Sequence, residues 1–387
     1  MKFNVRNTLF AFCALLFIAV SCKKTDEVTF TKFVKVESSE IIPAETIQNT
    51  IQAIVGDANL SSFGINFKSM QKTVISYKTT DEKNNEIEAS GVILYPAEAT
   101  TLNSLYSVQH GTCDFKDAPS LSTFPIEAIH SLYNNVVCMA DYIGYGKTEW
   151  KNFHPYLHKE STANTCYDML IATTEYLKSI ELDYGTENHV NIIGYSQGGA
   201  ATVALQQLIE KDNKLTIDKV RAGGSPLDLK ETMKSLTTQN YYSHLGYVLM
   251  IINSMNVCHD LNLDYNKIFK EEYVDCIELL NNHTFEEINS ILGNDVKAIF
   301  HDDFFMENYN NNPEFAKLSS AFEKNNLIEG FQPQTHLILY HSITDEIVPY
   351  TNQIIAANSF TNCTAEILKA TGHLEGGLEF FIRTILF

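Results

Sequence analysis

The segment Gly194-x-Ser196-x-Gly198 has the spacing G-x-S-x-G, which is typical of a serine held on a sharp turn between a strand and a helix. Glycines at both ends let neighbouring backbone approach the turn closely. An apolar, β-branched run (189–196) precedes the motif and small residues (199–201) follow it, as this turn requires. Ser196 is therefore the predicted nucleophile of an acyl-transfer reaction. The alternative is a tight turn without chemistry.

A serine hydroxyl is a weak nucleophile, so a base must take its proton. His373 is the predicted base, because it follows Gly372 in a loop between a predicted strand and the last helix. Asp345 is the predicted acid that orients this histidine, since it follows the apolar run 336–341. Glu346 is the rival acid, and a turn-forming role is the alternative for Asp345. Along the chain the three residues follow the order serine, acid, histidine, which is the order expected when the nucleophile lies on such a strand-to-helix turn.

The oxyanion of an acyl-transfer intermediate needs N–H donors held in place. The sequence predicts the backbone N–H of Gln197, directly after the nucleophile, and the N–H of Thr112, after a buried strand. His110 is expected to orient that loop or to contact substrate, with a role as base as the alternative. Tyr142 is the other candidate substrate-binding residue, and packing is its alternative role.

The elements that must position these residues alternate between strands and helices, which predicts an α/β fold with a mostly parallel sheet and helices on both faces. The run 72–80, a polar turn and the run 86–96 predict a hairpin. The other predicted strands are 104–111, 135–146, 189–196, 219–226, 335–342 and 365–370, and the predicted helices are 41–56, 161–180, 197–211 and 374–387.

The interval 227–334 separates two predicted strands by far more than the usual 2–6 residues of such a connection. It is rich in aromatic residues, Met and Asn, and it contains helical stretches such as 241–255. We therefore expect a helical cap inserted into a core made of 41–226 and 335–387. The apolar side chains of the cap suit an acyl site, and they equally suit its own core.

The N-terminus predicts export. Basic residues precede the apolar run 8–20, which is too short to span a membrane and is followed by Ser21 and Cys22. This pattern predicts a bacterial lipoprotein signal at 1–21, lipidation of Cys22 and a polar tether at 22–40. The protein would then be anchored by lipid in the cell envelope, facing the periplasm or the exterior. An ordinary signal peptide is the alternative.

Composition narrows the possible partners. The 387 residues carry a formal net charge of −19, which argues against a basic surface for nucleic acid. The cysteines form no CxxC pair, which argues against a zinc site. The proposed chemistry needs no cofactor. We expect a monomer acting on a small-molecule or lipid ester.

Six cysteines remain when Cys13 and Cys22 of the N-terminal segment are set aside. In an oxidising compartment these six could pair, and a bridge between Cys258 and Cys276 is the candidate. These cysteines are Cys113, Cys138, Cys166, Cys258, Cys276 and Cys363.

Several motifs together resemble the secretory lipase family of α/β-hydrolases. In family order over about residues 70–387 they are QHGT (109–112), DYIGYG (141–146), HPYLHKESTANTCYDML (154–170), GYSQGG (194–199), AGGSPLDL (222–229), HSITDEIVP (341–349) and GH (372–373). The resemblance implies a carboxylic ester hydrolase, an esterase or lipase, with a cap after the sixth core strand. It implies Ser196, Asp345 and His373 as the catalytic residues. Ser342 departs from the glycine that many relatives have there.

Two other functions remain open from the sequence. A serine peptidase shares the fold and the catalytic residue types, but it needs a subsite for a peptide terminus. Acidic residues in the cap (Glu271, Glu272 and Asp275) could supply one, although such residues usually form a solvated helix surface. A surface binding protein on an inactive hydrolase fold is the non-enzymatic alternative, against which the complete set of catalytic residue types argues.

Overall fold

The computed structural model describes residues 30–56, 65–148, 153–237, 240–305 and 312–386. The predicted signal segment and the lipidation site Cys22 lie outside these residues. Within them, no helix combines the length and the apolar character needed to cross a membrane.

A nine-stranded sheet forms the centre of the molecule, in the order β1-β2-β3-β6-β5-β8-β9-β10-β11. The strands from β6 to β11 run parallel, and β1, β2 and β3 add an antiparallel edge that contains the predicted hairpin. The central strands β5 and β6 are buried along their whole length, and β8 is buried after its first residue, because both faces of the sheet are covered. The strands are β1 (Phe33–Ile42), β2 (Met70–Thr80), β3 (Glu86–Pro96), β5 (Leu105–Gln109), β6 (Val136–Ala140), β8 (His189–Tyr195), β9 (Thr216–Gly223), β10 (Leu337–Ser342) and β11 (Cys363–Leu368), with a separate pair β4 (Thr101–Leu102) and β7 (Asp183–Tyr184).

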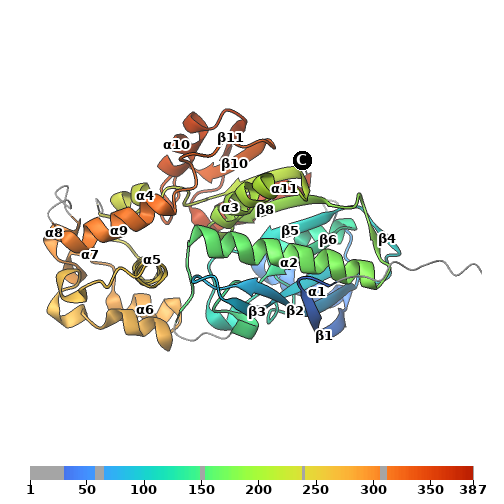
Figure 1. Ribbon diagram of the computed structural model, residues 1–387, viewed down its shortest axis with the longest axis horizontal. Helices are drawn as coiled ribbons and strands as arrows, with labels where there is room; N and C mark the ends of the chain where they lie inside the picture. The colour runs from blue at the N-terminus through green and yellow to red at the C-terminus, as the bar shows by residue number, and fades with distance from the viewer. Residues whose placement is uncertain (1–29, 57–64, 149–152, 238–239, 306–311, 387) are drawn as a thin grey trace, which may run out of the picture.

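Helices cover both faces of this sheet, as the α/β-hydrolase fold requires (Figure 1). The long helices α2 (Lys159–Ser179) and α3 (Gln197–Asp212) pack on one face, where small residues of α3 sit close to the strands. The other face is covered by α1 (Ala44–Val55), the 3-10 helix η3 (Ile126–Tyr133) and α11 (His373–Leu386). Helix α10 (Thr351–Ser359) connects β10 to β11.

The interval between β9 and β10 folds into helices with an apolar core of its own, at one end of the molecule (Figure 1). The backbone N–H of Leu327 donates to the carbonyl of Leu227 (2.9 Å), so the two ends of this interval are joined. We call it the helical insertion. Its helices are α4 (Leu229–Thr237), α5 (Leu245–Cys258), α6 (Phe285–Leu292), α7 (Val296–Ile299), α8 (Asp302–Phe305) and α9 (Pro313–Lys324).

The predicted tether at 22–40 is wrong for its last residues, because β1 begins at Phe33 and pairs with β2. Much of β1 is exposed because it is an edge strand with one uncovered face, and charged residues are common on such strands. This exposure explains why the segment looked like a tether in the sequence.

The predicted bridge between Cys258 and Cys276 is also wrong, since both are free thiols. The sulfur of Cys258 lies 3.8 Å from the Ser254 hydroxyl, whereas Cys276 packs into the core of the helical insertion. Both thiols are buried, and they act here as small apolar side chains.

Candidate active site

Ser196 occupies the turn between β8 and α3, with a φ of 59° and a ψ of −124°. A positive φ is unusual for a residue with a side chain, and it is maintained here by surrounding contacts. The Ser196 N–H donates to the Gly223 carbonyl (2.8 Å), and its carbonyl accepts from the Gly199 N–H (2.9 Å). A side chain at Gly198 would collide with the backbone of Gln109, so glycine is required there.

His373 links Ser196 to Asp345. Its Nε2 lies 2.8 Å from the Ser196 hydroxyl, and its Nδ1 lies 2.7 Å from Asp345 Oδ2. His373 is only 4% exposed, and the Asp345 side chain is inaccessible to solvent. In the tautomer that donates from Nδ1 to the carboxylate, Nε2 is free to accept the serine proton.

The Asp345 carboxylate is held by N–H donors on both oxygens. Oδ1 accepts from the backbone N–H groups of Ile347 (2.9 Å) and Val348 (2.8 Å). Oδ2 accepts from His373 and also from Nε2 of His341, 3.1 Å away. Burial by itself would raise the pKa of Asp345, but the hydrogen bonds from His341 and His373 outweigh it and hold the pKa well below its usual range.

The loops that carry the acid and the histidine are connected by further hydrogen bonds. The rival acid Glu346 accepts from the backbone N–H of His373 (3.0 Å), whereas Asp345 contacts the ring. The Ser342 hydroxyl donates to the Ala370 carbonyl (2.8 Å), so the departure from glycine adds a contact between the two loops. Tyr195 donates its hydroxyl to the His373 carbonyl (2.9 Å).

The predicted oxyanion donors flank Ser196. Gln197 is the first residue of α3, so its N–H has no acceptor within the helix. Thr112 lines the same cleft as Ser196, and its hydroxyl lies 2.8 Å from that of Tyr156. Both residues are therefore close enough in the fold to serve one site.

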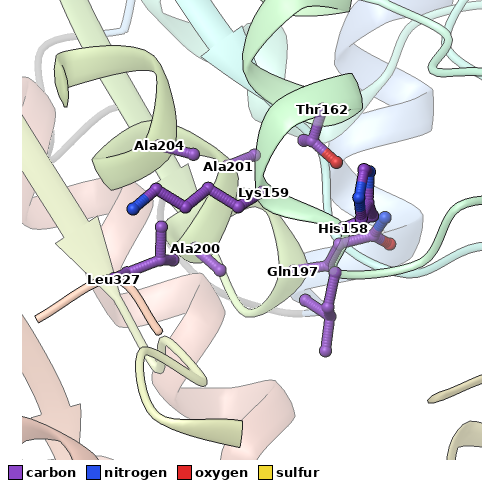
Figure 2. A pocket seen from close by; sticks show the side chains of 9 residues that line it. His158, Lys159, Thr162, Gln197, Ala200, Ala201, Ala204 and Leu327 are labelled. Atoms are coloured by element: carbon purple, nitrogen blue, oxygen red, sulfur yellow. The ribbon is translucent and has the colours of Figure 1, made fainter. Parts of the chain in front are cut away.

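The Gln197 side chain lines a separate small pocket over α3. Figure 2 shows Gln197 and His158 on one side of this pocket and Lys159 on the other. The Gln197 amide donates to Nε2 of His154 (2.8 Å), and Nδ1 of His154 donates to the Ile143 carbonyl (2.6 Å). The side chain therefore fixes the first turn of α3.

The structure does not support His110 and Tyr142 as substrate-binding residues. Both are buried, neither lines the cleft at Ser196, and their rings stack with centroids 4.0 Å apart. His110 contacts the carbonyls of Gly111 (2.7 Å) and Asp141 (3.3 Å), so it orients the loop as its other predicted role requires. Burial lowers the pKa of His110 to about 4, despite these two hydrogen bonds.

Two cavities meet at Ser196. The larger is a cleft of about 380 Å³ that also includes His373 and a row of residues on α11. The smaller is a slot of about 20 Å³ between the core and α5 of the helical insertion. Tyr247 of α5 lines both cavities.

In the described residues, no group of three or more His, Cys, Asp or Glu side chains is placed to hold a metal ion.

The parallel sheet, the strained serine after β8 and the histidine after β11 define an α/β-hydrolase fold with a serine-centred site. The chain belongs to the secretory lipase family, whose family model matches residues 130–376. Membership supports the hydrolysis of ester substrates and indicates a secreted protein. No curated protein sequence matches the chain.

Solved structures share the fold at low sequence identity. A Legionella pneumophila protein is 23% identical, with a TM-score of 0.79, over 92% of this chain and 96% of its own. The rice cell wall degrading esterase LipA from Xanthomonas oryzae is 20% identical, with a TM-score of 0.72, over 90% and 94%. Lipase A from Candida antarctica is 16% identical, with a TM-score of 0.62, over 88% and 78%.

Sequence reasoning missed His341, which contacts Asp345, and His154, which contacts Gln197. Both lie in the segments that carry the family resemblance, yet neither has a position that signals a contact with the reacting groups. A lone histidine in an apolar strand such as β10 is indistinguishable from a core residue until the pairing is known.

Proposed function

We propose that this chain hydrolyses carboxylic esters with Ser196 as nucleophile, His373 as general base and acid, and Asp345 as the acid that orients His373. The observation that supports this function is the unbroken hydrogen-bonded chain from Asp345 through His373 to the Ser196 hydroxyl. Geometry of this kind activates a serine by removing its proton as it attacks.

The reaction follows from these contacts. Nε2 of His373 takes the hydroxyl proton while Oγ of Ser196 bonds to the ester carbonyl carbon. The N–H groups of Gln197 and Thr112 stabilise the resulting oxyanion. The bond to the alcohol oxygen then breaks, and His373 gives its proton to that oxygen. Water, deprotonated by His373, attacks the acyl-enzyme, and the acid departs as Ser196 regains its proton.

The ionised Asp345 matters because His373 becomes positively charged in both transition states. A buried carboxylate whose pKa lies well below its usual range stays charged and stabilises this imidazolium. No metal or organic cofactor enters any of these steps.

We also propose the setting of the enzyme. The helical insertion (227–334) acts as a cap over a core formed by residues 41–226 and 335–387, since α5 borders Ser196. The N-terminal pattern supports a lipoprotein, anchored through Cys22 in a bacterial cell envelope. Its substrate is a small-molecule or lipid ester, and it acts as a monomer.

The test is hydrolysis of p-nitrophenyl esters by the purified full chain, beside release of p-nitroaniline from aminoacyl anilides. Ester hydrolysis that is lost in Ser196→Ala supports the proposal. Cleavage of anilides with no cleavage of esters would replace it with a serine peptidase. Inertness toward both, together with no reaction with a fluorophosphonate, would indicate a binding protein.

A further inference from the structure

We infer that the two cavities at Ser196 divide the substrate, so that the slot takes a short acyl group and the cleft takes a bulky apolar alcohol. This inference rests on the proposed function and names its substrate class: acetyl or propionyl esters of large apolar alcohols. Three observations lead to it, namely the walls of the cleft, the size of the slot and the side on which His373 lies.

The cleft presents an apolar surface from elements that lie far apart in the chain. Residues of α11 spaced three and four apart, including Leu374, Leu378 and Phe381, form one wall. Ile54 of α1 and Ile126 of η3 form another. Leu374 is 74% exposed, so a ligand placed here would bury apolar surface that the fold leaves in water. The volume of about 380 Å³ is that of a ligand pocket.

The slot is small and closed on several sides. Tyr156 and Val348 line it from the core, and Tyr242 lines it from the helical insertion together with Val248 and Ile251 of α5. These residues of α5 lie on one face of the helix, three apart in sequence. A cavity holds one water-sized group in about 10–15 Å³ of such volume. A slot of about 20 Å³ therefore accepts the methyl group of an acetyl ester or the ethyl group of a propionyl ester.

The position of His373 assigns the two halves of the ester to the two cavities. His373 must protonate the leaving alcohol oxygen, so the alcohol has to extend from Ser196 on the side where Nε2 is accessible. His373 lines the cleft and is not among the residues that line the slot. The alcohol therefore occupies the cleft, and the acyl chain, which points the other way from the same carbonyl carbon, enters the slot.

Placing the acyl group in the slot and the alcohol in the cleft leaves the steps of bond making and bond breaking unchanged. Oγ of Ser196 bonds to the short acyl carbon, the bond to the bulky alcohol breaks, and the alcohol leaves with the proton from His373. The alcohol can leave through the open cleft, whereas the short acyl group stays in the slot until water removes it.

The experiment uses the purified full chain and two series of esters. One series varies the acyl group on p-nitrophenol from acetyl to octanoyl. The other keeps acetyl and varies the alcohol from ethanol to naphthol and octanol. An extra methylene that a pocket cannot accommodate costs about 10-fold or more in kcat/KM. We expect kcat/KM to fall at least 10-fold between propionyl and butyryl, and to rise with the size of the alcohol.

Matched variants separate the two cavities. Ile251→Ala enlarges the slot, so we expect the butyryl ester to gain at least 10-fold relative to acetyl. Leu378→Ala, in the cleft, should leave the acyl ranking unchanged and weaken the preference for naphthyl over ethyl acetate. Thermal unfolding of both variants confirms that they are folded, and Val248→Ala replaces Ile251→Ala if the latter is not.

The outcomes distinguish this inference from the proposed function. A preference for octanoyl over acetyl esters in the parent protein, or an acyl ranking that Leu378→Ala changes and the slot variants do not, would overturn the assignment while leaving ester hydrolysis intact. Absence of all ester hydrolysis and of fluorophosphonate labelling would overturn the proposed function itself, and the assignment with it.

Discussion

His341 Nε2 lies 3.1 Å from Oδ2 of Asp345, within β10 and the loop that follows it. The same oxygen accepts from His373, so two imidazole rings share one carboxylate oxygen. His341 is 1% exposed, and its single Nε2–H is shared between this carboxylate oxygen and the Val348 carbonyl (3.0 Å). It therefore helps to hold the acid in place, as a positioning residue.

We predict that His341→Leu lowers kcat about 10-fold and leaves KM unchanged. The variant removes an N–H donor from a buried charged acceptor, and such losses amount to about 1–3 kcal/mol. His341→Gln can keep a donor at the end of its side chain and should recover part of the loss. A change in KM with unaltered kcat, or no recovery with glutamine, would contradict the positioning role.

Asp345 and Glu346 allow a direct comparison of two neighbouring acids. Asp345→Asn should lower kcat by about 10⁴, because an amide cannot stabilise the imidazolium and favours the wrong tautomer. Glu346→Gln keeps an oxygen acceptor for the His373 N–H and should retain activity within about 10-fold. Steady-state kinetics on one ester suffices, and equal losses in both variants would contradict the assignment of Asp345.

The free energy of unfolding should decrease as the pH is lowered, because buried histidines stay neutral in the folded chain. Burial lowers the pKa of His110 and His158 to about 4, and that of His130 and His154 to about 3. Below about pH 6.5 the unfolded chain binds protons that the folded chain does not. Each such histidine then lowers the free energy of unfolding by up to about 1.4 kcal/mol per pH unit, until the pH reaches the pKa of that histidine in the folded chain.

Urea unfolding between pH 7 and pH 4.5 measures this effect. His130 lies away from Ser196 and contacts the Thr384 hydroxyl (3.0 Å), so His130→Asn tests one group without touching the site. The free energy of unfolding of this variant should depend less steeply on pH than that of the parent. An identical slope would show that His130 titrates alike in the folded and unfolded chain.

Gly198 and Gly111 differ in the space around them, although both lie near Ser196. A Cβ at Gly198 would collide with the Gln109 carbonyl, which belongs to the backbone and cannot move aside. Gly198→Ala should therefore lower both the melting temperature and kcat. At Gly111 the nearest atom, the Tyr195 carbonyl oxygen, would lie 3.7 Å away, so Gly111→Ala should fold normally. Equal melting temperatures in both variants would contradict this account.

The sequence predicted the parallel core well because its strands are short apolar runs, each followed by a helix. Ser196, Asp345 and His373 were predicted together because each follows a strand, and the carboxyl ends of parallel strands meet at one edge. These signals are local, and the fold needs no information beyond the order of elements to bring the residues together.

Other features depend on neighbours that the sequence does not reveal. Strand β1 looked polar because only its pairing with β2 makes it part of the sheet. His110 and Tyr142 looked accessible beside the site, but stacking and burial make them part of its support. The contact of His341 with Asp345 depends on how the chain turns back after β10, and composition carries no trace of that turn.

The most direct test of the central claim is labelling of the purified chain with a fluorophosphonate, followed by peptide mapping. The proposed mechanism predicts one labelled peptide, with the phosphonyl group on Ser196, and no labelling in Ser196→Ala. It also predicts that Asp345→Asn slows labelling far more than Glu346→Gln does. Continued labelling of Ser196→Ala, or attachment to another residue in the parent protein, would contradict Ser196 as the nucleophile.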